Sequence, residues 1–200
     1  MSKKLFSHHQ TRGQRGDTLV EVLLAMVILS AVIVGASILM NSGLRSSINA
    51  VEHTQVRNVI ASQGELLRYL RDGYQAGSDD FNSAQWRKIV NQGNQYVATA
   101  APTDVEACAP GPGRKAFYLV ATFLDVSQAP RIDLVEYDGT SNDTAPHAVP
   151  GRGVWVEGVA STGASPAYID FHLRGCWIGL GSSINQHVNS VVRLYVPEGS

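Results

Sequence analysis

The sequence predicts an α+β fold: a long N-terminal α-helix, one half transmembrane and one half amphipathic, packed on an antiparallel β-sheet head. Three observations predict it. Residues 22–44 carry no charge, and apolar residues then recur at helical spacing to about residue 70. The remaining residues show short alternating stretches separated by loops rich in Gly, Pro, Ser, Asn and Asp. A chain of 200 residues suffices for one such domain with an accessory segment.

The charges are unevenly distributed along the chain. Residues 1–16 hold four of the 16 basic side chains and no acidic one, so this segment carries +4. The rest of the chain holds the other 12 basic side chains and all 17 acidic ones, a net charge of −5. The absence of a basic surplus there argues against nucleic acid as a partner of the folded part. Basic residues mark the cytoplasmic side of a membrane segment, which predicts an N-terminus inside and residues 45–200 outside.

The uncharged run is long enough to span a membrane. Its 23 residues, Val22 to Leu44, make about 34 Å of helix, and the hydrocarbon core is about 30 Å thick. A secretory signal has a shorter apolar core followed by a small-residue cleavage site. The sequence therefore predicts a single-pass membrane protein that keeps this segment.

Glu21 places a carboxylate at the start of the apolar run. Such a group costs about 2.5–3.5 kcal/mol at the centre of a span and less near the interface. One interpretation is that it reaches back to the cytoplasmic headgroups. The other is that it pairs with a cation, for which the best candidate is a new amino terminus created by cleavage after Gly16.

The stretch Gly16-Asp17-Thr18-Leu19-Val20-Glu21, with a basic leader before it and an apolar helix after it, resembles the processing site of type IV prepilins and pseudopilins. The resemblance covers about residues 12–45. It implies cleavage between Gly16 and Asp17 by a membrane aspartic prepilin peptidase, and methylation of the new amino terminus on Asp17. It also implies that Glu21 lies near the terminal amine of an adjacent subunit and helps to set the register of a filament.

The sequence departs from the family pattern at two points. The usual first mature residue is phenylalanine, whereas this chain has Asp17, whose carboxylate competes with Glu21 for the amine. The proline found midway along many pilin helices is absent, since the first proline is Pro102. Gly35 and Gly43 are the weak points instead, each costing about 1 kcal/mol in a helix interior. We expect either local loosening or close helix packing at these glycines.

The helical pattern continues beyond the membrane segment. Its apolar positions are Ile48, Val51, Val56, Val59, Ile60, Leu66, Leu67 and Leu70. They form one face of a helix, which is expected to pack against a globular head. Asp72-Gly73 is predicted to end the helix, which would then cover residues 17–71.

The head is predicted to contain a short helix at 82–92, anchored by Trp86, and an antiparallel meander. The expected strands lie at 116–124, 131–139, 153–159, 168–178 and 188–196. Most connections are too short for crossover helices, which excludes βαβ units there. The aromatic residues of the strands, Trp155 and Trp177 among them, are expected in the core. The division of the chain is therefore 1–16 leader, 17–44 assembly helix, 45–72 amphipathic helix and 73–200 head.

Cys108 and Cys176 are the two cysteines. Neither lies in a CxxC pair or near a histidine cluster, so no metal is predicted. In an exported chain we expect a disulfide that closes a loop of about 70 residues. The alternative is a pair of buried thiols in a reducing compartment.

No catalytic motif stands out, because neither an HExxH nor a GxSxG pattern occurs. We therefore predict no enzyme and no cofactor. The resemblance to prepilins implies a structural subunit of an extracellular type IV pilus or pilus-like filament, a minor or a major pilin. Its expected partners are other pilin subunits, the prepilin peptidase, membrane lipid before assembly and, indirectly, an assembly ATPase and a platform protein. A pseudopilin of a secretion or DNA-uptake system is the alternative. A signal-anchored binding domain or enzyme is a further one, which leaves Gly16 and Glu21 unexplained.

Overall fold

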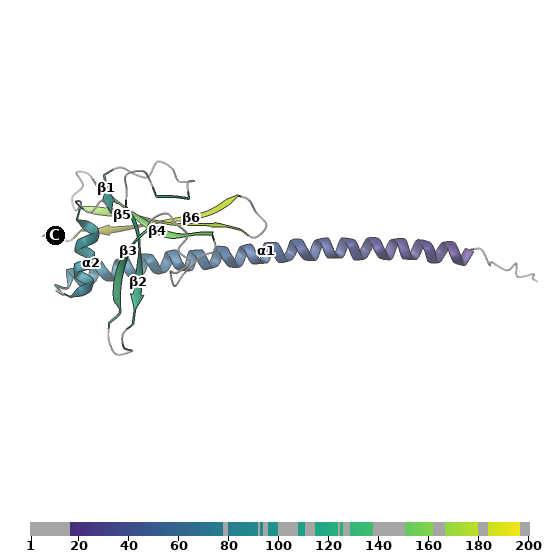
Figure 1. Ribbon diagram of the computed structural model, residues 1–200, viewed down its shortest axis with the longest axis horizontal. Coiled ribbons are helices and arrows are strands. Elements are labelled where there is room, and N and C mark those ends of the chain that lie inside the picture. The colour runs from purple at the N-terminus through teal and green to yellow at the C-terminus, as the bar shows by residue number, and fades with distance from the viewer. Residues whose placement is uncertain are drawn as a thin grey trace, which may run out of the picture. The chain divides into compact units, whose positions relative to one another are not determined.

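The computed structural model describes residues 17–77, 80–91, 93, 96–99, 108–110, 115–123, 125, 129–137, 151–161, 167–179 and 184–196. The chain divides into two compact units, residues 1–46 and 47–200. Its elements are α1 (Asp17–Gln75), α2 (Phe81–Val90), β1 (Val97–Ala98), β2 (Ala116–Thr122), β3 (Arg131–Tyr137), β4 (Gly151–Ala160), β5 (Tyr168–Ile178) and β6 (Asn185–Tyr195). A long N-terminal helix followed by a largely antiparallel sheet confirms the predicted α+β class (Figure 1).

Helix α1 is continuous from Asp17 to Gln75 and passes through Gly35 and Gly43 without a break. The end predicted at residue 71 is wrong, because the helix runs through Asp72-Gly73. The chain turns at Gly77 instead, which has a φ of +74° and donates its N–H to the Tyr74 carbonyl at 3.1 Å. The extra turn lets Tyr74 pack against the core. We attribute the extension to this burial, which offsets the roughly 1 kcal/mol that a helical glycine costs.

The strands lie in the order β3-β2-β4-β5-β6, and β1 pairs with β4 off this path. The neighbouring pairs along the path are antiparallel, as predicted, and β1 runs parallel to β4. The order differs from a simple meander, since β4 pairs with β2 and leaves β3 at the edge (Figure 1). Strand β1 was not predicted, because two residues are too few for an alternating pattern.

The sheet opens between β2 and β4, which share the single register pair Phe117–Val156. Beyond it, α1 supplies hydrogen bonds to β2. Gln63 donates its side-chain amide to the Leu119 carbonyl at 2.9 Å and accepts the Leu119 N–H at 2.8 Å. On β4, Gly158 donates its N–H to the Tyr96 carbonyl at 3.0 Å. Backbone groups at the opening are thereby satisfied although the two strands diverge.

The main core lies between the sheet and the part of α1 in residues 47–75. Alternate strand residues face it, and its members include Val56, Ile60, Leu67, Leu70, Trp86, Phe117, Val156, Phe171, Leu173 and Leu194. The helix approaches the sheet closely. A Cβ added at Gly175 of β5 would lie 2.4 Å from Cγ1 of Val56, and one at Gly64 of α1 would lie 3.3 Å from Cγ2 of Val192. Gly64, a weak residue for a helix, therefore lets α1 pack closely against Val192.

A second buried cluster contains Cys108, Ala116, Tyr137, Trp155 and Cys176. These strand residues alternate with those of the main core, so the cluster occupies the opposite face of the sheet. The Tyr137 and Trp155 rings stack with centroids 5.2 Å apart. The structure joins Cys108 and Cys176 by a disulfide, with Cα atoms 5.7 Å apart and 68 positions between them in sequence.

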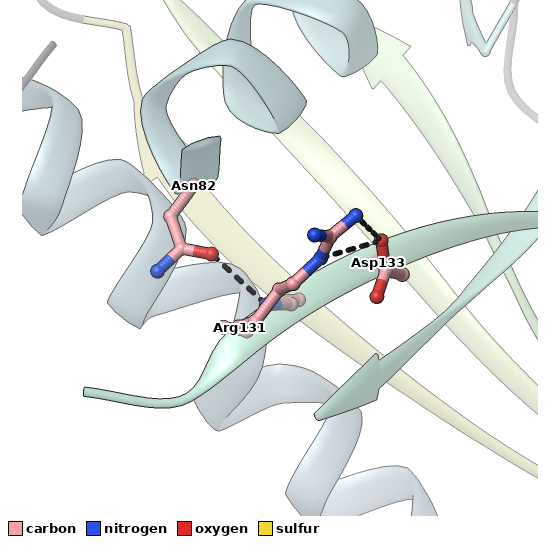
Figure 2. Close-up of polar contacts among 4 residues, drawn as sticks. Asn82, Arg131 and Asp133 are labelled. Carbon is pink, nitrogen blue, oxygen red and sulfur yellow. Dashed lines mark hydrogen bonds and ion pairs between the residues drawn. The ribbon is translucent and has the colours of Figure 1, made fainter. Parts of the chain in front are cut away.

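Helix α2 holds the hairpin of β2 and β3. Asp80 caps the helix by accepting the Ser83 N–H at 2.9 Å. Asn82 accepts the Ile132 N–H at 2.9 Å, and its amide donates to the Pro130 carbonyl at 3.0 Å. Figure 2 shows Asn82 beside Arg131, which also contacts Asp133 on the same strand. Trp86 is fully buried and lies 6.1 Å from the Phe171 ring, which confirms that it anchors this helix.

Candidate processing and assembly site

The first part of α1 is apolar and exposed along its length. An 18-residue window of this helix reaches a mean hydropathy of 2.8, and none of that window is buried within the chain. The helix is therefore long and apolar enough to cross a membrane by length and composition. Its side chains include Leu23, Val27, Leu29, Val32, Ile33 and Leu39. Because so large an apolar surface is unfavourable in water, it needs lipid or other protein around it.

Two serine hydroxyls within this stretch are satisfied inside the helix. Ser30 donates its hydroxyl to the Met26 carbonyl at 2.7 Å, and Ser37 donates to the Ile33 carbonyl at 2.8 Å. Such bonds remove the penalty of an unpaired hydroxyl in hydrocarbon. Gly35 and Gly43 have nothing within 4 Å of the position of an added Cβ. Their surface is open to the close approach of another helix.

Unlike these serines, Glu21 has a polar group that the helix does not satisfy. It is exposed on α1, and among the residues that the structure describes it has no hydrogen-bond or ion-pair partner. It lies four positions after Asp17, the first residue of the helix, so the two positions share one helix face. Gly16 and the rest of the leader lie outside the described residues, as does the bond predicted to be cleaved.

Residues 11–37 match the family model described as the prokaryotic N-terminal methylation motif. The match spans 27 of the 200 residues and includes Gly16, Asp17 and Glu21. No curated protein and no solved structure gives a significant match to the chain.

These findings define a class: a chain with one apolar N-terminal helix that fits membrane anchoring, an N-terminal methylation motif and an α+β head. Together they support a type IV pilin-like protein. The pilin-type motif implies a structural protein. It also implies interactions, of a general kind, with pilin subunits and a prepilin peptidase.

The apolar face predicted for residues 48–70 is only partly buried. Burial begins at Val56, whereas Ile48 is 39% and Val51 is 55% exposed. Beside Asn49, a cavity of about 300 Å³ lies against β5 and β6. Sequence reasoning missed this cavity, because its walls come from segments more than 120 residues apart. A wider cavity of about 720 Å³ lies at the other end of the sheet, near Tyr74 and Tyr168.

No metal site emerges from the described part of the chain, where three or more His, Cys, Asp or Glu side chains never gather in a ligating arrangement. Asp170 and Arg193 form an ion pair between neighbouring strands. Arg193 donates to both carboxylate oxygens at 2.8 Å, and these hydrogen bonds lower the pKa of Asp170. This pair joins β5 to the edge strand β6 and has a structural role.

Proposed function

We propose that this chain is the structural subunit of an extracellular type IV pilus or pilus-like filament, cleaved after Gly16 and polymerised through the first part of α1. A single observation carries the proposal: within the methylation motif, an exposed apolar helix bears the carboxylate of Glu21, which has no partner among the described residues. A surface of this kind is complete only when something outside the chain covers it and supplies a positive charge.

Cleavage creates that charge. The amine of Asp17 becomes free when Gly16 is removed, and it then carries a proton at neutral pH. Within one chain it lies at the start of the same helix as Glu21. In a bundle of parallel helices it also lies within reach of Glu21 on a neighbouring chain. The pairing of an amine with a carboxylate in an apolar environment fixes the register of adjacent helices, because a mismatched register leaves both charges buried and unpaired.

The same helix serves before and after assembly. In the membrane, lipid covers its apolar side chains, with the leader on the cytoplasmic side and the head outside. In the filament, other copies replace the lipid, and Gly35 and Gly43 allow close contact between helices. The proposed parts of the chain are 1–16 leader, 17–44 assembly helix, 45–72 amphipathic helix and 73–200 head. We propose that export also lets the Cys108–Cys176 disulfide form.

Transfer out of the membrane costs free energy that the chain does not supply, so the proposal requires an assembly ATPase and a platform protein. It also requires a prepilin peptidase and a methyl donor for the amine of Asp17. The subunit is a minor or a major pilin, or a pseudopilin of a related machine. Its copy number in sheared filaments separates these roles.

The first test is the mass of the protein extracted from membranes and from sheared filaments. We expect the mass of residues 17–200 plus one methyl group. Gly16→Ala should leave the full-length mass and abolish filament incorporation. Recovery of wild-type protein that still carries residues 1–16 would contradict the proposal and favour a signal-anchored domain.

Glu21 is tested separately from cleavage. Glu21→Ala should be processed normally and yet be lost from filaments, because the amine of the neighbouring chain then has no counter-charge. Val20→Ala is the matched control, since it alters the adjacent exposed residue without changing charge. Normal incorporation of Glu21→Ala would show that register is set by other contacts.

A further inference from the structure

A cavity lies between the sheet and the N-terminal end of the part of α1 in residues 47–75. Its volume is about 300 Å³, and its walls are Asn49, Ala50, His53, Trp177, Gly179 and Gln186. The ring of His53 meets the ring of Trp177 in an edge-on arrangement, with centroids 5.9 Å apart. The cavity is therefore lined by an aromatic surface and by side chains that form hydrogen bonds.

Glu52 adds a carboxylate next to this cavity. Its Oε2 lies 3.9 Å from the position of a Cβ added at Gly179, on the cavity wall. That oxygen is buried and has no hydrogen-bond partner among the described residues. A buried carboxylate oxygen without a partner is unfavourable, so the free chain leaves an interaction here unmade.

Two cations on the same helix are also unmatched. Arg45 and Arg57 are exposed, and neither forms a hydrogen bond or ion pair among the described residues. The neighbouring arginines of α1 differ in this respect, since Arg68 pairs with Glu65 and Arg71 pairs with Asp72. In addition to Glu21, α1 thus carries one acid, Glu52, and two bases, Arg45 and Arg57, that find no partner among the described residues.

The register of the proposed filament decides which of the two arginines of a neighbouring chain comes close to Glu52. This step rests on the proposed function, in which Glu21 meets the amine of Asp17 on a neighbouring parallel helix. That contact offsets the two helices by four residues, so Arg45 of the neighbour comes level with Asn49. It is then three residues, or about 4.5 Å of rise, from Glu52. Arg57 of the neighbour comes level with residue 61, nine residues or about 13.5 Å away.

We propose that Glu52 and its cavity bind the Arg45 side chain of a neighbouring copy of this chain. The guanidinium offers five N–H donors, which suit Glu52 together with the side-chain oxygens of Asn49 and Gln186. The exposed apolar residues Ile48 and Val51 flank the contact and are covered with it. The contact at Glu52 then holds the same register as the contact at Glu21, about 46 Å further along the helix.

Charge exchange tests the pairing in cells that assemble the wild-type filament. Glu52→Arg and Arg45→Glu should each lower the amount of filament about tenfold, and the two changes combined in one chain should restore most of it. Arg57→Glu combined with Glu52→Arg is the matched control and should restore nothing. Glu52→Gln removes the charge but keeps the shape of the side chain. It should also lower the amount of filament, and this reduction would not be due to misfolding of the head.

A second experiment measures proximity. One chain carries Glu52→Cys, a second chain with a mass tag carries Arg45→Cys, and purified mixed filaments are treated with a short thiol-specific crosslinker. We expect a heterodimer of the two chains, and none when Arg57→Cys replaces Arg45→Cys. The native cysteines are joined to each other and leave no free thiol.

Cleavage of residues 1–16 is measured for every variant. This measurement distinguishes a failure of the Glu52–Arg45 contact from a failure of the proposed function. If wild-type chains are cleaved and form filaments but the exchange gives no rescue and no heterodimer, the Glu52–Arg45 contact is wrong and the proposed function stands. If wild-type chains remain uncut or form no filaments, the proposed function fails, and the contact fails with it.

Discussion

The two parts of α1 share one continuous helix but satisfy their side chains in different ways. Before residue 47 the apolar residues are exposed, and Glu21 has no partner among the described residues. From Val56 onward one helix face is buried against the sheet, and the polar Gln63 on that face makes two hydrogen bonds. The part of α1 from Val56 onward is therefore stabilised by packing within the chain. The part before residue 47 needs lipid or other protein around it.

This difference separates the polar groups that the chain satisfies from those that it does not. Gln63 and Asn82 are buried and have hydrogen-bond partners, although Ser83 Oγ and Trp86 Nε1 in the head are also buried and have none among the described residues. Glu21 is exposed and Glu52 borders a cavity, and we propose that another copy of the chain supplies a partner for both. Both lie on α1, the element that we propose mediates assembly.

The largest expected contrast is between two leucines of the same helix. Leu67→Ala should lower the free energy of unfolding of the head by about 2–5 kcal/mol, because Leu67 is fully buried and its loss leaves a cavity. Leu29→Ala should leave that free energy unchanged, since Leu29 is 54% exposed. Near-ultraviolet circular dichroism of the full chain in detergent micelles, followed during denaturation, measures both. Equal losses for the two variants would contradict a division of α1 by environment.

A second comparison concerns two polar residues of α1, Gln63 in the buried part and Glu21 in the exposed part. Gln63→Leu should destabilise the head by about 1–3 kcal/mol, because the N–H and carbonyl of Leu119 lose their partner where β2 and β4 separate. Glu21→Gln should leave the stability of the head unchanged, although it alters a charge. Amide exchange of Leu119 gives a local measurement. It should accelerate in Gln63→Leu and stay slow in Glu21→Gln.

Much of this arrangement could be predicted from the sequence, because local patterns carry it. The uncharged run, the helical spacing after it and the alternation in β5 each depend on neighbours in the chain. The parts that were missed depend on distant residues. The opening between β2 and β4 is stabilised by Gln63, and the parallel strand β1 is held at Gly158. Neither contact leaves a signal in the local pattern.

The candidate site residues also differ in whether a local sequence pattern could identify them. Gly16, Asp17 and Glu21 could be singled out because a short contiguous motif contains them, and their roles in cleavage, methylation and register remain proposals. Glu52 could not, since its significance depends on Gly179 and Trp177, which reach it only through the fold. The early stop predicted at Asp72-Gly73 failed for a related reason, because the packing of Tyr74 outweighs the local signal.

The glycines of α1 offer a smaller contrast. Gly64→Ala should destabilise the head by about 0.5–1 kcal/mol. The added methyl group presses on Val192 at 3.3 Å, and the gain in helix propensity offsets only part of that strain. Gly43→Ala meets nothing within 4 Å in the chain and should leave the head as stable as before. Thermal unfolding of the two variants in the same detergent makes the comparison. Greater stability of Gly64→Ala would show that the helix and the sheet have room to separate.

The smallest expected effect concerns the pair of Asp170 and Arg193 at the edge of the sheet. Hydrogen bonds from Arg193 lower the pKa of Asp170 below its ordinary value of 3.8. A lowered pKa in the folded state means that the pair stabilises the head above that ordinary value. The contribution is lost as the pH falls below it, because Asp170 becomes protonated. The effect is small, since solvent screens an exposed pair. In an acid titration, the stabilities of wild type and Asp170→Asn should therefore converge as the pH falls through the lowered pKa of Asp170. If wild type and Asp170→Asn already have the same stability at neutral pH, the pair does not stabilise the head.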